Sequence, residues 1–320
     1  MAIERKKIGI VGCGNVGATL GFYLTVEHIC DDMVLIDRNE KKAVAEMLDL
    51  SHSLGYSGNN INIKTGTYAD CGNLDVIVIA VSVPYKPGMV RTDMAAGAVR
   101  IIREIVPEIM ASGFKGIFVV ITNPVDVVTY YVQKLSGLPD ERVIGTGTSL
   151  DSARLRLYLA QVMGVDPRSV DGFVMGEHGD SQFIPWSLVS VGSKKFTEIL
   201  KDNPERLKGI NLEEADRYTS QIAYSIMEAK GATTYGIAAV TGQIIRAIME
   251  DENKVFPVST MFHGEYGMED IYMGIPAVLT SHGVKELVEY HLTDEEQASL
   301  AKSADFLRAT NASVKEELLL

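Results

Sequence analysis

The sequence predicts an α/β protein, with a doubly wound parallel sheet in the first half and an α+β domain in the second. In the first half, short runs of β-branched residues alternate with stretches of helical periodicity. These short runs are continuously apolar, which is typical of parallel strands that are covered on both faces. Successive β–α units of this kind form a doubly wound sheet. After residue 145 the alternation stops and longer helical patterns dominate.

The elements of the first half follow one another in strict alternation. The expected strands are 6–12, 33–37, 74–81, 116–122 and 142–147, and the helices between them are 16–27, 40–54, 93–112 and 124–137. The stretch PYKPGMVRTD, residues 84–93, follows the third strand and holds two prolines and a glycine. Such residues mark a loop between ordered elements. This loop carries Tyr85 and Arg91.

The second half mixes helices with fewer strands. Helical patterns are expected at 149–164, 214–231 and 232–253, and strand-like segments at 173–179, 255–262 and 275–280. A capping box from Thr293 to Glu296 predicts the start of a C-terminal helix. No flexible linker separates the halves, so we place the boundary near residue 145, between domains 1–145 and 146–320.

Composition excludes several classes of protein. The 320 residues carry a net charge of −12, whereas domains that bind nucleic acid are usually basic. The three cysteines form neither a disulfide framework nor a metal-ligand pattern, which favours a reducing, cytoplasmic compartment without a bound metal. No run approaches the roughly 20 apolar residues of a membrane span. Asn15 and several glycines interrupt the apolar run near the N-terminus, so we do not expect a signal peptide.

A glycine-rich turn lies between the first strand and the first helix. Gly12, Gly14 and Gly17 fit the pattern G-x-G-x-x-G, in which a helix N-terminus and close backbone approach bind a pyrophosphate. Asp37 ends the second strand, where a carboxylate accepts hydrogen bonds from a ribose and repels a 2′-phosphate. The adjacent Arg38 weakens that discrimination. The pattern predicts an NAD-binding Rossmann domain, and the alternative is a structural turn with a surface aspartate.

A candidate proton carrier lies in the second half. His178 stands in GEHGD, between glycines that suit an exposed presentation, and its pKa near neutrality suits proton transfer in a redox step. Asp151 and Arg154 lie on one face of the preceding helix, at i and i+3. They could orient the histidine and bind substrate, or they could form an exposed ion pair of little energetic value. Spacing alone favours the second interpretation.

Another candidate, Asn123-Pro124, ends a strand at the carboxyl edge of the sheet, where open α/β sheets bind ligands. This pair could be a structural turn with a cis bond, or it could present Asn123 to a cofactor.

Seven motifs in order resemble the L-lactate/malate dehydrogenase family, closest to its bacterial L-lactate members. They are GCGNVG, Asp37, the loop P-x-K-P-G-x-x-R, TNPVDV, LDSAR, GEHGDS and KGATTYG. The resemblance implies an enzyme that converts pyruvate, NADH and a proton to L-lactate and NAD⁺ in glycolysis and fermentation. It also implies a homo-oligomer, for which we expect a tetramer.

The resemblance also implies a role for each motif residue. His178 would donate and accept the proton, Asp151 would orient its imidazole, Arg154 would bind the substrate carboxylate, and Arg91 would polarise the ketone on a closing loop. The further substrate-binding positions would be Tyr85, Asn123 and Thr233, and the further cofactor contacts would be Val16, Tyr68, Asn123 and Thr146. All four catalytic residues are present, which argues against a dinucleotide-binding protein that has lost its chemistry.

Tyr85 departs from the family pattern, which has glutamine in lactate dehydrogenases and arginine in malate dehydrogenases. Without a cationic partner, the second carboxylate of oxaloacetate costs about 2–5 kcal/mol in a closed pocket. That is roughly a hundredfold or more in discrimination. We therefore expect a monocarboxylate, with pyruvate first. Alternatives are a bulkier 2-oxo acid beside Tyr85, malate with help from Lys86, or a Tyr85 that faces solvent.

A second departure concerns regulation. Bacterial relatives bind fructose 1,6-bisphosphate between subunits through an arginine and a histidine. Arg156 occupies the arginine position, but Asp171 replaces the histidine and would repel a phosphate. We therefore expect no activation by this sugar phosphate.

Overall fold

A nine-stranded sheet runs through the protein. The computed structural model describes residues 5–58, 60–83, 91–205, 207 and 210–315. The strands lie in the order β12-β11-β10-β6-β5-β4-β1-β2-β3. Six of them come from the first half: β1 (Lys7–Val11), β2 (Asp32–Ile36), β3 (Asn62–Thr65), β4 (Val76–Ile79), β5 (Ile117–Val120) and β6 (Val143–Gly145). All pairs among these six are parallel, which confirms the doubly wound sheet.

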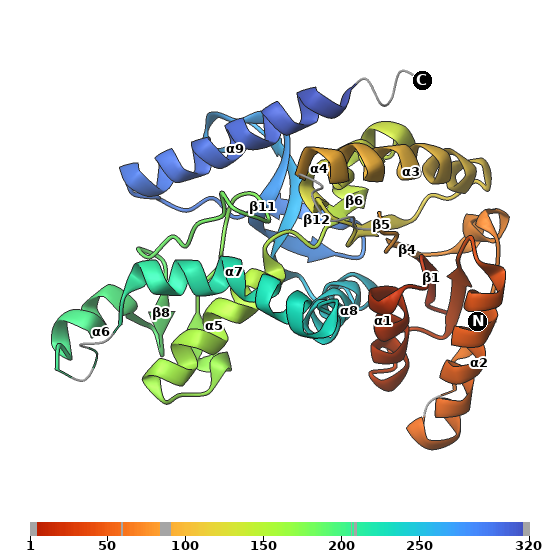
Figure 1. Ribbon diagram of the computed structural model, residues 1–320, viewed down its shortest axis with the longest axis horizontal. Coiled ribbons are helices and arrows are strands. Elements are labelled where there is room, and N and C mark those ends of the chain that lie inside the picture. The colour runs from red at the N-terminus through yellow and green to blue at the C-terminus, as the bar shows by residue number, and fades with distance from the viewer. Residues whose placement is uncertain (1–4, 59, 84–90, 206, 208–209, 316–320) are drawn as a thin grey trace.

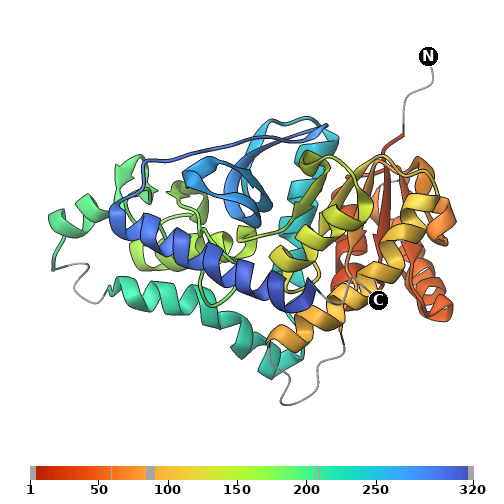
Figure 2. The same ribbon diagram turned by 90° about the horizontal axis from the view of Figure 1, so that it is seen from above.

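Two helical layers cover this sheet, as Figures 1 and 2 show. One layer contains α3 (Arg91–Ala111), α4 (Val125–Ser136) and α9 (Asp294–Val314), and the other contains α1 (Asn15–Val26), α2 (Glu40–Ser57) and α8 (Tyr235–Met249). Successive strand residues face opposite layers, so Ile77 and Ile79 join the first core while Val76 and Val78 join the second. All four are fully buried, and this burial explains why the strand is apolar without alternation.

The sheet continues beyond residue 145. Strands β10 (Lys254–His263), β11 (Glu269–Thr280) and β12 (Gly283–Leu287) pair antiparallel and extend the sheet from β6, where Ser259 lies opposite Gly145. The strands expected at 255–262 and 275–280 are therefore part of the same mixed sheet. The expected strand-like segment 173–179 is wrong as a strand, because it forms only isolated bridges at Met175 and Gly176.

A third core lies beside the large sheet. It packs α5 (Ser149–Met163) and α6 (Phe196–Asp202) against the small sheet of β7 (Val170–Asp171), β8 (Ser190–Val191) and β9 (Lys194–Lys195). Helix α7 (Leu212–Lys230) lies along α5. Together with β10–β12, these elements form the α+β part that the sequence predicts.

The C-terminal helix begins as predicted. The hydroxyl of Thr293 accepts a hydrogen bond from the Glu296 amide at 3.3 Å, and the Glu296 carboxylate accepts one from the Thr293 amide at 2.9 Å. This capping box satisfies two amides that helix geometry leaves free. Across the described ranges, no helix combines the length and hydropathy that a bilayer span requires.

Candidate active site

The glycine-rich turn joins β1 to α1 at the carboxyl edge of the sheet. Gly12 has φ +102°, and a Cβ there would lie 2.6 Å from the Ala80 carbonyl oxygen. A Cβ on Gly17 would lie 2.0 Å from the Gly12 carbonyl oxygen, so only glycine lets α1 pack this closely. Gly14 instead faces open space, with no heavy atom within 4 Å of a Cβ built on it. A phosphate group can therefore approach the backbone at Gly14, directly before the first residue of α1.

Asp37 follows β2 at the same edge and is held from two sides. One carboxylate oxygen accepts the Cys13 amide and the other accepts the Asn39 amide, both at 2.8 Å. Asp37, Gly12, Gly14 and Tyr68 line one cavity of about 300 Å³. The open approach at Gly14 and the Asp37 carboxylate that lines the same cavity fit the pyrophosphate and ribose of a dinucleotide.

The other predicted cofactor contacts lie around this edge. Tyr68 begins a short 3₁₀ helix, and burial raises the pKa of its phenol. Val16 is half-buried in the first turn of α1. Asn123 is exposed after β5 and forms a cis bond with Pro124, while Thr146 is buried directly after β6. Sequence reasoning missed several residues that line the cavity, and no motif marks them: Asn39, Lys42, Ser82, Ile101 and Ile105.

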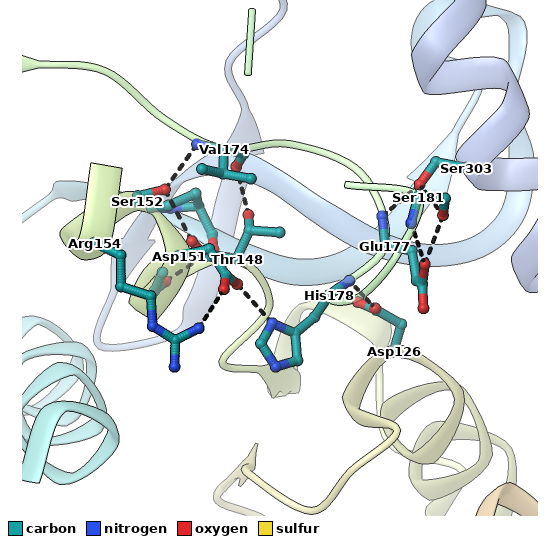
Figure 3. A network of polar contacts seen from close by, with 12 residues as sticks. Asp126, Thr148, Asp151, Ser152, Arg154, Val174, Glu177, His178, Ser181 and Ser303 are labelled. Atoms are coloured by element: carbon teal, nitrogen blue, oxygen red, sulfur yellow. Dashed lines mark hydrogen bonds and ion pairs between the residues drawn. The ribbon is translucent and has the colours of Figure 1, made fainter. Parts of the chain in front are cut away.

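The candidate residues of the second half are His178, Asp151 and Arg154. Hydrogen bonds join them into one group (Figure 3). Asp151 lies in the first turn of α5 and bonds His178 through one oxygen, with 2.6 Å between Nδ1 and Oδ2. Its other oxygen accepts a hydrogen bond from Arg154 Nη1 at 2.8 Å. The Asp151 side chain is 1% exposed and that of Arg154 is 11% exposed. The interpretation of this pair as a solvent-exposed ion pair is therefore wrong.

The electrostatics of this group favour a charged histidine. Burial opposes the charge of Asp151, but the neighbouring His178 and Arg154 outweigh it and lower the pKa of Asp151. Burial also opposes a charge on His178, but the carboxylates of Asp151 and Asp126 outweigh this effect and raise the pKa of His178. With the ionised Asp151 as acceptor, Nδ1 carries a hydrogen and Nε2 is left for proton exchange.

The segment that carries His178 is anchored on several elements (Figure 3). Its Gly176 pairs with Gly274 of β11 through two backbone hydrogen bonds, each 2.9 Å. The Glu177 amide donates to Ser303 of α9 at 2.6 Å, and the His178 amide donates to Asp126 of α4 at 2.8 Å. Sequence reasoning missed Asp126 and Ser303. Asp126 stands within the TNPVDV motif, which could have drawn attention to it, whereas nothing in the sequence marks Ser303.

The α5 end of the site is anchored in a similar way. Ser152 donates to the Thr148 carbonyl and accepts the Val174 amide, both at 2.8 Å. The Thr148 hydroxyl donates to the Val174 carbonyl at 2.5 Å. These bonds tie the first turn of α5, with Asp151, to the segment that leads into His178.

The predicted substrate residues besides Arg154 are Asn123, described above, and Tyr85, Arg91 and Thr233. Tyr85 lies outside the described residues, and so does the side chain of Arg91, although α3 begins at Arg91. Thr233 is half-buried in the turn between α7 and α8, outside the hydrogen-bonded network that the described residues form around His178.

The two positions considered for sugar-phosphate binding are Arg156 and Asp171. Both lie where α5 meets the small sheet of β7–β9. Arg156 donates to the Gly172 carbonyl at 3.1 Å and lies over the Phe173 ring, 5.1 Å from its centroid. Burial lowers the pKa of Arg156, and the nearby Asp171 carboxylate opposes that effect.

The described residues contain no cluster of three or more His, Cys, Asp or Glu side chains that could hold a metal.

The fold and this site define an oxidoreductase: a dinucleotide cavity at the sheet edge, and a histidine–aspartate–arginine group suited to a carboxylate-bearing substrate. The family model for the NAD-binding domain of lactate/malate dehydrogenases matches residues 6–145, and that for the α/β C-terminal domain matches residues 148–318. The chain belongs to the lactate/malate dehydrogenase family, as the sequence motifs predict, and NAD is its cofactor.

Individual relatives agree over nearly the whole chain. L-lactate dehydrogenase 3 of Bacillus cereus is 44% identical over 308 residues, covering 96% of this chain and 98% of its own. L-lactate dehydrogenase of Macrococcus caseolyticus is 45% identical over 306 residues, covering 96% of both chains. The ligand-bound crystal structure of a minor L-lactate dehydrogenase from Enterococcus mundtii is 40% identical and has a TM-score of 0.93, covering 97% of this chain and 98% of its own.

Proposed function

We propose that the chain is an NAD-dependent L-lactate dehydrogenase that reduces pyruvate to L-lactate. The observation that carries the proposal is the shared carboxylate of Asp151, which holds His178 with one oxygen and Arg154 with the other. This arrangement holds an imidazole and a guanidinium next to each other, which supports His178 as the proton carrier and Arg154 as the partner of the substrate carboxylate. A 2-oxo acid needs both, because its ketone carbon is bonded directly to its carboxylate.

In the proposed reaction, Arg154 binds the substrate carboxylate and His178 transfers the proton. Arg154 uses one donor on Asp151 and keeps its remaining N–H groups for two parallel hydrogen bonds to the substrate carboxylate. NADH, when bound, supplies the hydride that adds to the ketone carbon. His178 gives the proton from Nε2 to the ketone oxygen, and the imidazole that remains keeps its Nδ1 hydrogen on Asp151. In lactate oxidation His178 takes the proton back from the hydroxyl.

The remaining predicted residues complete the site. Arg91 polarises the ketone when its loop closes and excludes water. Asn123 binds near the nicotinamide and the substrate, and Thr233 lines the substrate pocket. We assign to Tyr85 the role of this loop position in the family, which is to meet the far end of the substrate; a second carboxylate would have no cationic partner in a tyrosine.

The substrate is tested by comparing kcat/KM with NADH for four acids: pyruvate, oxaloacetate, 2-oxoisocaproate and phenylpyruvate. We expect pyruvate to lead, with oxaloacetate lower by roughly a hundredfold or more because its second carboxylate is unpaired. In the variant Tyr85→Arg the oxaloacetate value should rise, while Tyr85→Gln should keep the preference for pyruvate.

Two outcomes of this comparison would contradict the proposed substrate. A lead for the bulky acids would mean that Tyr85 borders a larger pocket, the alternative that this departure motivates. A lead for oxaloacetate would mean that Lys86 or another cation meets the second carboxylate. Neither outcome would alter the family or the use of NAD.

We also propose that fructose 1,6-bisphosphate does not activate the enzyme. Asp171 places a negative charge near Arg156, and Arg156 is already engaged by Gly172 and Phe173. At low pyruvate concentration, the rate should be the same with and without the sugar phosphate. The variant Asp171→His, which restores the usual residue pair, is the matched control. Stimulation of the unaltered enzyme would overturn this proposal.

We further propose a homotetramer in the cytoplasm, with an NAD-binding domain at 1–145 and a catalytic domain at 146–320. Resemblance to lactate-type enzymes supports the tetramer, and three buried free cysteines suit a reducing compartment.

A further inference from the structure

Two cations line the cofactor cavity on the side of Asp37. Arg38 lies in the turn between β2 and α2, and Lys42 lies in the first turn of α2. Ile101 and Ile105 of α3 line the same cavity, and apolar side chains of this kind suit an adenine. Because the Asp37 carboxylate fits the adenosine ribose, the two cations belong to the adenosine end of the site.

The fold itself makes no use of these two charges. Within the described ranges, neither the Arg38 guanidinium nor the Lys42 ammonium forms an ion pair or a hydrogen bond with another residue. Arg38 is exposed, but Lys42 is half-buried, where an unpaired charge costs free energy. Both also lie at the N-terminus of α2, where the helix dipole favours anions over cations. Cations that are unpaired and opposed by the dipole indicate a role in binding an anion.

One fixed carboxylate, Asp37, accompanies the two cations. Its oxygens accept the amides of Cys13 and Asn39, both at 2.8 Å. Burial raises the pKa of the Cys13 thiol to about 12, Asp37 and Glu46 add to that rise, and Lys42 opposes it. Lys42 therefore acts on the same part of the cavity as Asp37 without forming an ion pair with it. Of the described charged side chains that line this cavity, one is negative and two are positive.

The group that fits these cations is a phosphate on the adenosine ribose. The pyrophosphate of a dinucleotide already has its place at Gly14 and the N-terminus of α1. A 2′-phosphate, like other phosphate monoesters, carries a charge of about −1.5 to −2 and three acceptor oxygens. A guanidinium binds such a group through two parallel hydrogen bonds, and an ammonium attracts it as a point charge. The two cations therefore match the phosphate that distinguishes NADPH from NADH.

We propose that Arg38 and Lys42 form a subsite for the 2′-phosphate of NADPH, so that the enzyme reduces its 2-oxo acid with NADPH as well as with NADH. The chemistry at the substrate is unchanged: the ketone carbon receives the hydride, the ketone oxygen receives the proton from His178, and NADP⁺ and the 2-hydroxy acid are released. This inference rests on the proposed function, and it gives the enzyme a second source of hydride.

NADH should remain the better cofactor, because Asp37 repels a 2′-phosphate but accepts a hydrogen bond from the 2′-hydroxyl of NADH. The two cations offset part of that repulsion. At saturating pyruvate we expect similar kcat values with the two cofactors, and a kcat/KM for NADPH that is lower than that for NADH by about tenfold to a hundredfold.

Variants of the two cations test the subsite through the ratio of kcat/KM for NADPH to that for NADH. Arg38→Leu and Lys42→Leu each remove one positive charge, and each should lower this ratio by about tenfold. Lys42→Arg keeps the charge and should keep the ratio. Lys41→Leu is the matched control, because Lys41 is the neighbouring residue of α2 but is exposed and does not line the cavity. Its ratio should equal that of the unaltered enzyme.

A second readout does not depend on turnover. Isothermal titration calorimetry on the free enzyme compares adenosine 5′-monophosphate with adenosine 2′,5′-bisphosphate, two probes that differ only in the 2′-phosphate. In Arg38→Leu and Lys42→Leu, the Kd for the bisphosphate should rise about tenfold relative to the Kd for the monophosphate. In Lys41→Leu the two Kd values should keep their ratio.

The outcomes separate this inference from the proposed function. Turnover with NADH but none with NADPH would overturn the subsite and leave the proposed function intact. Turnover with NADPH at a ratio that stays the same in Arg38→Leu and Lys42→Leu would overturn the subsite as well. If none of the four acids is reduced with either cofactor, the proposed function fails, while the calorimetric comparison still decides whether these cations bind the 2′-phosphate.

Discussion

Replacing His178 with asparagine is expected to lower kcat for pyruvate reduction by about a thousandfold, within the range of general acid catalysis. Asparagine can still donate a hydrogen bond to Asp151, but it has no proton to give to the ketone oxygen at neutral pH. The loss is measured as the rate of NADH oxidation, both in the steady state and in a single turnover. Single turnover separates the chemical step from product release.

The role of His178 also predicts how the rates of pyruvate reduction and lactate oxidation depend on pH. The pKa of His178 is raised, so the unaltered enzyme should reduce pyruvate well below that pKa and lose activity as pH rises through it. Lactate oxidation needs the neutral imidazole and should lose activity as pH falls through the same pKa. Both dependences should flatten in His178→Asn. His263→Asn is the matched control. His263 is exposed and lies beside Asp140, near the amino end of β6, so the activity of this variant should be unchanged. Full turnover in His178→Asn would rule out His178 as the proton carrier.

Replacing Arg154 with leucine is expected to lower kcat/KM for pyruvate by about a hundredfold to a thousandfold, or about 3–4 kcal/mol. The substrate carboxylate would lose its bidentate partner, and Asp151 would lose the cation on its second oxygen in a buried position. Much of the cost comes from leaving buried charges unpaired. Steady-state kinetics over a range of pyruvate concentrations measures it.

Two further variants test whether the lower kcat/KM of Arg154→Leu comes from the missing guanidinium. Arg154→Lys keeps the charge without the planar fork, so its kcat/KM should fall between those of the unaltered enzyme and Arg154→Leu. Arg168→Leu removes an exposed arginine paired with Asp166 and should leave the kinetics unchanged. An unchanged KM for pyruvate in Arg154→Leu would contradict the proposed role of Arg154 in binding the carboxylate.

The parallel half of the fold could be predicted because each element carries its own signal. Strands such as Val76–Ile79 are apolar at every position because both faces are buried, and this pattern is local. Gly12 and Gly17 are needed by backbone geometry within a single turn, so their spacing, with a strand before it and a helix after it, predicts a phosphate-binding turn. The capping box at Thr293 is equally local, and the structure has it where the sequence predicts it.

The continuation of the sheet could not be predicted in the same way. Strands β10–β12 join the sheet through the contact of Ser259 with Gly145, residues that are far apart in the sequence. Hydrophobic pattern indicates that a segment is a strand, but it does not say which edge the strand joins. The same limit explains segment 173–179, whose apolar character reflects burial between elements rather than a place in a sheet.

The site, like the fold, could be predicted only in part from the sequence. By itself, the sequence determined the residue types: the glycine turn with Asp37, the helical spacing of Asp151 and Arg154, and the histidine between glycines. Only the tertiary structure decided that Asp151 is buried, that it binds His178 and Arg154 at once, and that Asp126 and Ser303 hold the segment of His178. The physical reason is that periodicity and turn geometry act between near neighbours in the chain. The energy of a buried charge depends instead on partners that folding brings from distant segments.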